Sequence, residues 1–366
     1  MDAMRPYLTK HHGNPGSLHR FGRTARRAVE HAREQVATLI GATPEEILFT
    51  SSGTEANNTL LTGLHRPSRS LTEDVICSSI EHHSVIDLIQ DRRSPDPLQS
   101  DLIPVTPQGV ANDPTLRDRL ASGVRLVSLM YANNEIGVLQ PIAEMGRLCH
   151  EHDVLFHTDA VQALGKIEID TRLLPLDAMT LSAHKIGGPK GIGAAFVRRE
   201  TALQPLLRGG AQERHLRAGT ENVASIVGFG KACEIAQTDS LSHWKRIREL
   251  RDQLANHILE TIPSTWVNGG EVEGLPNILN VGFEGLEGEG IMMALDAEGI
   301  AVGTGSACSS GSVDPSHVLL AMGQSHRQAH AAIRFSLGTS TTSREIDHTL
   351  DILPALIARL RQENLA

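Results

Sequence analysis

Residues 124–158 read VRLVSLM-YANNEIGVLQP-IAEMGRLCHEHD-VLFHT, with an apolar segment at each end. Val124–Met130 is apolar enough to be a strand buried on both faces, and Val154–Thr158 is a second short strand. Between them, Ile142–Asp153 has the apolar spacing of a helix. A strand, a helix and a strand in this order predict a mainly parallel sheet with right-handed crossovers.

The same alternation extends in both directions along the chain. Toward the N-terminus, Arg26–Ile40 has the pattern of an amphipathic helix, Ile47–Thr50 that of a strand and Thr54–Gly63 that of a second helix. Further strands are expected at Ala178–Ser182 and Ile192–Val197. The first part of the chain is therefore predicted to be an α/β domain.

A different pattern begins near residue 240, where apolar residues recur every three or four positions and predict one long helix into a second domain. After it, short strands (Ile278–Phe283, Ala332–Ser336) mix with helices, and the Gly/Ser-rich segment Gly303–Ser312 interrupts them. The apolar positions of the long helix are Leu241, Trp244, Ile247, Leu250, Leu254 and Ile258.

Composition is that of an ordinary globular protein, with 40% hydrophobic and 21% charged residues in 366. The net charge of −9 argues against a protein that binds nucleic acid through phosphate contacts. No apolar run reaches the roughly 18 residues of a membrane span, and residues 1–6 lack the apolar core of a secretion signal. We therefore expect neither nucleic-acid nor membrane binding.

Four cysteines lie far apart without a CxxC pair: Cys77, Cys149, Cys233 and Cys308. This spacing indicates neither a disulfide framework nor a zinc site, and no metal site is predicted. A reducing, cytoplasmic location is expected.

Polar residues follow several predicted strands, at the edge where ligands bind in a parallel sheet. Ser51-Ser52-Gly53-Thr54 opens a helix after Ile47–Thr50, which suits a phosphate, although Ser and Thr are also ordinary helix caps. Asn133 and Asn134 follow Val124–Met130 and could orient a ligand or form a turn. This edge is therefore the candidate site.

Two further strand ends carry charged residues. Asp159 follows Val154–Thr158, with Gln162 three positions on, and a buried carboxylate there needs a partner: a protonated ring nitrogen, an arginine or a helix N-terminus. Lys185 follows Ala178–Ser182 beside His184, and burial with neighbouring charge could make it a Schiff-base lysine rather than an exposed turn residue. A phosphate cradle, an amide, an aspartate and a lysine on successive strands are the arrangement of a pyridoxal phosphate site.

At this point the sequence resembles the cysteine desulfurases of the class V aminotransferase superfamily, and within them the group with a longer, mobile catalytic loop. The resemblance implies a fold type I pyridoxal-phosphate enzyme, with a mainly parallel seven-stranded sheet in the large domain and a smaller C-terminal α+β domain. We expect the large domain at residues 10–245 and the small one at 246–366, with residues 1–9 packing on the small domain. The matching motifs are Asn14–His19 (NPGSLH), Thr50–Asn58 (TSSGTEANN), Glu81-His82-His83, Asn133–Val138 (NNEIGV), His157–Gln162 (HTDAVQ), Ser182–Gly193 (SAHKIGGPKGIG), Arg217–Asn222 (RAGTEN), Gly305–Ser310 (GSACSS) and Ala332–Gly338 (AIRFSLG).

The resemblance also implies a role for each site residue. Lys185 would form the Schiff base, Asp159 would keep the pyridinium nitrogen protonated, and His82 would stack on the ring and share proton transfer with Lys185. Asn134 and Gln162 would reach the ring substituents. The phosphate would be bound by Gly53, Thr54, Ser182 and His184, and by Thr220 of a second copy, which implies an obligate homodimer.

For the substrate, the resemblance implies that Arg334, with Asn14, holds the carboxylate of L-cysteine and that Cys308 accepts the sulfur as a persulfide. Alanine would leave, and the sulfur would pass to an acceptor protein, such as an iron–sulfur scaffold or a thiolation protein.

Two alternatives stay open. One is another pyridoxal-phosphate enzyme on this fold, such as a selenocysteine lyase. The other is a non-catalytic binding or scaffold homologue, because family members usually begin with a strand of the type YLDNAATTP, whereas this chain starts at Met1-Asp2-Ala3.

Overall fold

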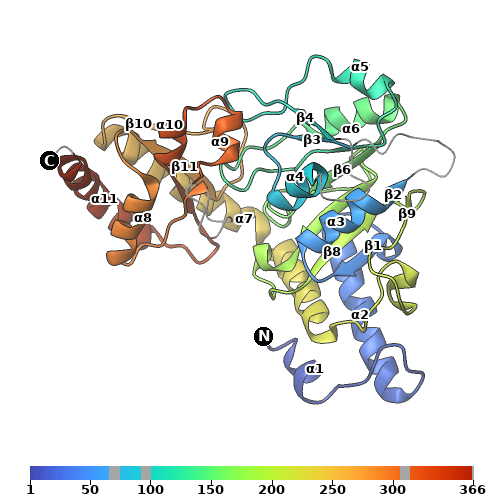
Figure 1. Cartoon of the computed structure of the whole chain (residues 1–366). Coiled ribbons are helices and arrows are strands. Elements are labelled where there is room, and N and C mark those ends of the chain that lie inside the picture. The colour runs from blue at the N-terminus through green and yellow to red at the C-terminus, as the bar shows by residue number, and fades with distance from the viewer. Residues whose placement is uncertain (66–74, 92–99, 306–313, 365–366) are drawn as a thin grey trace. The chain divides into compact units, whose positions relative to one another are not determined.

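The computed structural model describes residues 1–65, 75–91, 100–305 and 314–364 (Figure 1). Contacts divide the chain into two units. The large unit comprises Met1–Ile103, Pro114–Tyr131 and Pro141–Ser240. The small unit comprises Pro104–Asp113, Ala132–Gln140 and Leu241–Ala366.

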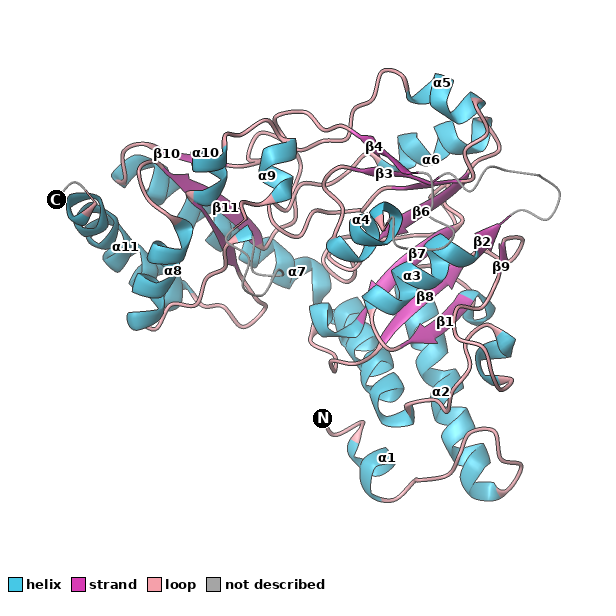
Figure 2. Cartoon of the chain, in the orientation of Figure 1, coloured by secondary structure: helices cyan, strands magenta, loops and turns pink. Residues whose placement is uncertain are grey.

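The seven-stranded sheet of the large unit confirms the predicted α/β class with mainly parallel strands. Its order is β1-β8-β7-β6-β5-β3-β4, and the pairs from β7 to β4 are all parallel. Within this sheet, β8 is antiparallel to both of its neighbours (Figure 2). The strands are β1 (Ile47–Thr50), β3 (Val75–Ser78), β4 (Ser100–Ile103), β5 (Leu126–Ser128), β6 (Leu155–Asp159), β7 (Ala178–Ser182) and β8 (Gly193–Val197).

Helices of the large unit cover this sheet. Helix α3 packs on β7 and β8 and contacts α4, and Figure 1 shows α3 in front of β8. The described helices are α1 (Arg5–Thr9), α2 (Arg20–Leu39), α3 (Gly53–Gly63), α4 (His83–Gln90), α5 (Leu116–Ala121), α6 (Ile142–Glu151) and α7 (Val223–Thr261), with 3-10 turns at η1 (Pro44–Glu46), η2 (Ala183–Ile186) and η3 (Gln212–His215) and a small sheet of β2 (Leu64–His65) and β9 (Ala202–Leu203).

Helix α7 begins earlier than the sequence pattern predicts. The apolar spacing starts at Leu241, but the helix starts at Val223. Its first half buries Ile226, Phe229 and Cys233 in the large unit, whereas Ile247 to Ile258 belong to the core of the small unit. The mostly polar stretch 234–240 (EIAQTDS) separates the two apolar sets, so the periodicity alone does not join them into one helix.

An antiparallel three-stranded sheet, β10-β11-β12, forms the centre of the small unit together with helices, in agreement with an α+β domain. Its elements are β10 (Thr265–Val267), β11 (Ile278–Phe283), β12 (Ala332–Ser336), α8 (Gly288–Ala297), α9 (His317–Ala321), α10 (His326–His330) and α11 (Ser343–Glu363).

The expected domain limits differ from this division in two ways. The main change falls after Ser240 rather than after residue 245, and two short loops of the first part join the small unit. Residues 1–9 belong to the large unit, not to the small one. The reason is that Met4 lies against Gly228 of α7, where the missing side chain makes room for it. None of the described helices is long and apolar enough to cross a membrane.

Candidate active site

The start of α3 forms a tight backbone corner at the carboxyl end of β1. Ser52 caps the helix, and its hydroxyl accepts a hydrogen bond from Glu55 N at 3.1 Å. A Cβ on Gly53 would lie 2.9 Å from Val161 Cγ2 and 3.6 Å from Ser182 Cβ, so only glycine fits without a shift. The corner therefore brings the exposed Thr54 and the end of β7 together.

The end of β7 adds two more polar groups. Ser182 Oγ lies 2.8 Å from His184 Nδ1, and burial, followed by the nearby Lys185, lowers the pKa of His184. Hydroxyls, free backbone N–H groups and a helix N-terminus together suit a phosphate. These four residues thus lie together as the sequence predicts, and their role stays a prediction.

Asp159 ends β6 and has two hydrogen-bond partners. Asn57 Nδ2 donates to Oδ2 at 2.7 Å, and Val161 N donates to Oδ1 at 2.9 Å. Among the described residues, its carboxylate is thus bound by an amide and by the turn that follows, rather than by an arginine. A carboxylate offers about four acceptor positions, which leaves capacity for a further donor.

Lys185 lies in the 3-10 turn η2, which ends at Gly187 with a left-handed φ of 78°. Its side chain is exposed in this unit, which corrects the expectation that burial tunes it. Burial is the largest cause that lowers the pKa values of His82, His184 and Lys166, and the charge of Lys185 lowers them further. Lys185 therefore shares one neighbourhood with these groups.

Gln162 is held by a lysine that the sequence argument missed. Lys166 Nζ donates to Gln162 O at 2.6 Å and to Oε1 at 3.3 Å. Burial, and to a lesser extent the charge of the nearby Lys185, lowers the pKa of Lys166 to about 7. Lys166 stands four residues after Gln162, and this spacing in the sequence could have indicated that the two side chains meet.

His82 caps the N-terminus of α4. Its Nδ1 atom accepts from Ser84 N at 3.0 Å and lies 2.8 Å from Ser84 Oγ. Burial lowers the pKa of His82, although the carboxylate of Asp159 opposes this effect. At neutral pH the ring is therefore uncharged.

In the small unit, Arg334 of β12 binds the loop that carries Asn134. Arg334 Nη1 donates to the main-chain oxygen of Asn134 at 3.0 Å. Asn133 is buried and accepts from Glu135 N and Ile136 N, so the turn alternative applies to Asn133. Gly303 pairs with Arg334 through the main chain, and Cys308 lies outside the described residues.

Asn14 and Thr220 are both exposed in the large unit. Asn14 Oδ1 accepts from Gly16 N at 2.9 Å, which closes the turn before α2. No group of three or more His, Cys, Asp or Glu side chains suited to a metal ion occurs in the described part of the chain.

Comparison with known proteins identifies the family. The model of the family described as aminotransferase class-V matches residues 1–349. A curated cysteine desulfurase IscS from Dictyoglomus turgidum is 43% identical and covers 98% of this chain and 91% of its own length. The chain belongs to the cysteine desulfurase family. A second member, the cysteine desulfurase IscS of Methanosarcina thermophila, is 42% identical over 99% of this chain and 89% of its own.

Solved structures agree with this family. A NifS-like protein superposes with a TM-score of 0.88 at 34% identity, covering 98% of this chain and 95% of the other. A structure titled "SspA in complex with cysteine" has a TM-score of 0.80 at 32% identity and covers 93% and 95%. The family and fold predictions are confirmed.

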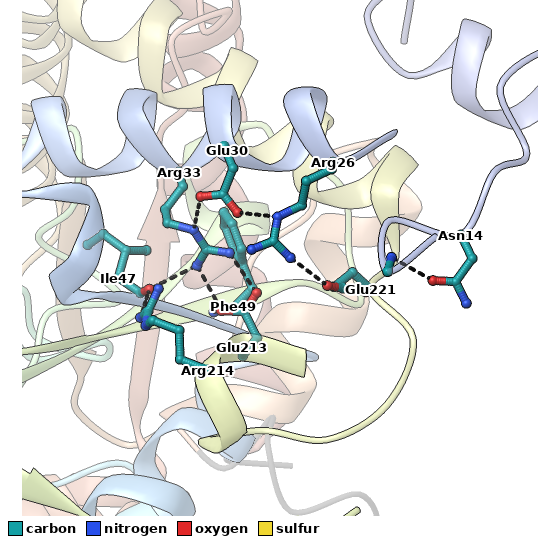
Figure 3. A network of polar contacts seen from close by, with 10 residues as sticks. Asn14, Arg26, Glu30, Arg33, Ile47, Phe49, Glu213, Arg214 and Glu221 are labelled. Atoms are coloured by element: carbon teal, nitrogen blue, oxygen red, sulfur yellow. Dashed lines mark hydrogen bonds and ion pairs between the residues drawn. The ribbon is translucent and has the colours of Figure 1, made fainter. Parts of the chain in front are cut away.

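Within this desulfurase family member, a buried ion pair anchors the segment that leads to Thr220 (Figure 3). Arg33 Nη1 and Nη2 donate to the two carboxylate oxygens of Glu213 at 2.8 and 2.7 Å, and Phe49 N donates to Glu213 at 2.9 Å. Glu213, Arg214 and His215 all have left-handed φ angles, of 43°, 56° and 64°. Such angles cost roughly 1–2 kcal/mol per residue, so the ion pair has to hold the turn in place.

Glu213→Gln should destabilise the protein by about 3–5 kcal/mol, because the buried guanidinium of Arg33 loses its buried charge partner and keeps only the partly exposed carboxylate of Glu30. Glu45→Gln is the matched control, since Glu45 forms an exposed pair with Arg199, and it should leave stability unchanged. Chemical denaturation measures both. Equal effects of the two variants would contradict the anchoring role of Glu213.

Glu81 gives the fold a specific pH dependence. It is fully buried, and Met130 N donates to its Oε1 at 2.7 Å. Burial, with a contribution from Asp159, raises the pKa of Glu81 from 4.5 to about 8. Between pH 4.5 and about 8, Glu81 is protonated in the folded state and ionised in the unfolded state. The free energy of unfolding therefore falls as the pH rises.

Glu81→Gln should remove this slope, because glutamine resembles the protonated carboxyl. The wild type should lose up to about 1.4 kcal/mol per pH unit in this range relative to the variant. Denaturation curves at several pH values between 4.5 and about 8 measure the difference. Glu144→Gln, at an exposed site on α6, is the control. A slope that survives in Glu81→Gln would place its origin elsewhere.

Proposed function

We propose that this chain is a pyridoxal-phosphate-dependent cysteine desulfurase that takes sulfur from L-cysteine, releases L-alanine and carries the sulfur on Cys308. The observation that carries the proposal is the gathering of Gly53, Ser182 and Lys185 beside Asp159 at the ends of the strands of the large unit. Family membership supports the same activity.

The described residues fit pyridoxal phosphate. The corner at Gly53, which has no room for a Cβ, would receive the phosphate together with Thr54, Ser182 and His184. The carboxylate of Asp159 retains acceptor capacity for a protonated ring nitrogen. Bound pyridoxal phosphate supplies an electron sink for the substrate carbon that carries the amine.

Gln162 and His82 complete this set on the large unit. Lys166 holds the amide oxygen of Gln162, so the amide NH₂ is left to donate to the phenolic oxygen of the cofactor. The ring of His82 would stack on the cofactor. The amine of Lys185 anchors the cofactor and then carries a proton at Nζ.

Three further residues would bind and attack the substrate. Arg334 would bind the carboxylate of L-cysteine, with Asn14 as a further polar contact. Sγ of Cys308, as a thiolate, forms a bond to the substrate sulfur while the bond from that sulfur to the substrate Cβ breaks. The electron pair left on carbon takes up a proton, so the products are L-alanine and a persulfide on Cys308.

The other three cysteines are poor candidates for this step. Cys77, Cys149 and Cys233 are buried free thiols. Burial raises the pKa of each of them, and the thiol rather than the thiolate is then the stable form. This comparison supports Cys308, which lies outside the described residues.

The homodimer and the sulfur acceptor belong to the same proposal. Thr220 is exposed and follows an anchored turn, which supports a contact with the cofactor phosphate of a second copy. The acceptor would be a protein that builds iron–sulfur clusters or thiolates a substrate. A cytoplasmic location is consistent with free cysteines at the three described positions.

A turnover assay tests the activity. The purified protein is loaded with pyridoxal phosphate and given L-cysteine, D-cysteine or L-selenocysteine, with and without a thiol reductant. We expect alanine from L-cysteine in a one-to-one ratio with sulfide when reductant is present, and protein-bound sulfur when it is absent. Preference for L-selenocysteine would favour a lyase, and bound cofactor without any alanine would favour a non-catalytic scaffold.

A further inference from the structure

His82 is held at one ring nitrogen by the residue two positions later. Ser84 N donates to His82 Nδ1 at 3.0 Å, and Ser84 Oγ lies 2.8 Å from the same atom. A backbone N–H can only donate, so Nδ1 has to accept. A neutral imidazole has one proton, which must then sit on Nε2.

The hydroxyl of Ser84 is oriented in turn by Asn57 of α3. Asn57 Nδ2 donates to Ser84 Oγ at 2.8 Å and to Asp159 Oδ2 at 2.7 Å. Because Oγ accepts from the amide, its own hydrogen is left to donate to His82 Nδ1. Asn57 is 1% exposed, so water does not compete for these contacts.

We propose that Ser84 and Asn57 are positioning residues that hold His82 as the Nε2–H tautomer, so that His82 presents a donor and proton transfer is left to Lys185. A ring nitrogen that already carries a proton cannot accept one, and accepting at Nδ1 would require breaking the cap of α4. The consequence for catalysis rests on the proposed function, whereas the tautomer concerns the protein alone.

The charges around His82 agree with an uncharged ring. Burial is the largest influence on its pKa and lowers it. Asp159 of β6 and Asp87 of α4 favour the charged ring, whereas His83 and Lys185 oppose it. On balance the pKa of His82 is lowered, so its ring stays neutral near pH 7.

His83 provides an internal control one position away. Its Nδ1 atom lies 3.1 Å from Asp87 Oδ1. An ionised carboxylate can only accept, so His83 has to carry a proton on Nδ1. The two neighbouring histidines should therefore differ at the same ring atom.

Long-range proton–nitrogen NMR of the ¹⁵N-labelled protein tests the tautomer. A His82→Gln variant assigns the signals. At neutral pH we expect an unprotonated Nδ1 for His82 and a protonated Nδ1 for His83. A His82 ring that is charged, or protonated on Nδ1, would overturn the proposal whatever the activity of the enzyme.

Substitutions at Ser84 test the source of the tautomer. Ser84→Ala should raise the pKa of His82 by about one unit, since one neutral hydrogen bond to Nδ1 is lost. Ser84→Thr keeps the hydroxyl and should restore the wild-type value. Asn57→Ala should shift the pKa of His82 in the same direction as Ser84→Ala. Ser343→Ala, in the exposed first turn of α11, is the matched control and should change nothing.

The pH profile of kcat separates positioning from proton transfer. If His82 only donates a hydrogen bond, the acidic and basic limbs of the kcat profile of Ser84→Ala should lie at the same pH as in the wild type. The pKa of His82 measured by NMR should nevertheless change. A limb that moves with the His82 pKa would make His82 a proton carrier and overturn the proposal. Inactivity of the wild type with the expected NMR signals would instead contradict the proposed function and leave the tautomer established.

Discussion

Lys185→Ala should abolish cysteine desulfuration and the covalent retention of pyridoxal phosphate. The reason is that the exposed amine at the end of β7 is the proposed anchor and the proposed proton carrier. Loss of a positioned proton carrier alone costs about a hundredfold to ten-thousandfold in rate. Steady-state alanine release measures the rate, and borohydride reduction followed by dialysis measures retention.

Lys166 is the competing anchor, because it is buried nearby with a pKa lowered to about 7. Peptide mapping of the reduced wild-type protein should find the cofactor on Lys185 and not on Lys166. Lys231→Ala, at an exposed site on α7, is the control and should keep full activity. A cofactor bound to Lys166, or retained in Lys185→Ala, would overturn the assignment.

The same variant tests the shared site of the proposed homodimer. A Lys185→Ala subunit mixed with a Thr220→Ala subunit should regain activity, because one site of the mixed dimer contains neither substitution. Native mass spectrometry confirms subunit exchange. Mixed dimers that stay inactive would show that Thr220 does not act across the interface.

Cys308→Ala should stop sulfur transfer and leave cofactor binding intact. None of the residues proposed to bind pyridoxal phosphate changes in this variant, so the cofactor spectrum should stay and should still respond to L-cysteine. Alanine release should fall by orders of magnitude, and no persulfide should form. Mass spectrometry after one turnover should find one added sulfur on the wild-type peptide that contains Cys308.

Cys233→Ala is the matched control for this prediction, since Cys233 is a buried free thiol. It should change stability by about 0.5–3 kcal/mol, as most core substitutions do, and keep turnover per folded molecule. If the sulfur is found on another cysteine, or if Cys308→Ala desulfurates cysteine at the wild-type rate, Cys308 is not the acceptor.

Much of the fold could be predicted from local patterns. The strands at Ile47–Thr50, Ala178–Ser182, Ile278–Phe283 and Ala332–Ser336 have the predicted bounds. Each is a short apolar run between turn residues, and the side chains within one element set that pattern. The order of the polar residues after these strands pointed to the site, because carboxyl ends of parallel strands meet at one edge.

Other features depend on contacts that no local pattern records. The antiparallel direction of β8, the early start of α7 at Val223 and the place of residues 1–9 in the large unit are of this kind. In each case the packing partner lies elsewhere in the chain. The exposure of Lys185 likewise follows from the turn after β7 and not from the apolar strand before it.

By itself the sequence determined the α/β class, the family and the motif residues, because these follow from neighbours within single elements and from runs of identical residues. Only the tertiary structure decided that Asn57 lies between Asp159 and Ser84, and that Arg33 meets Glu213. Asn57 and Asp159 are 102 positions apart, and Arg33 and Glu213 are 180 apart. Hydrogen bonds and ion pairs form between atoms that are close in space. In the sequence Asn57 looks like an ordinary helix residue and Arg33 like a surface charge, but in the folded protein both stabilise the site.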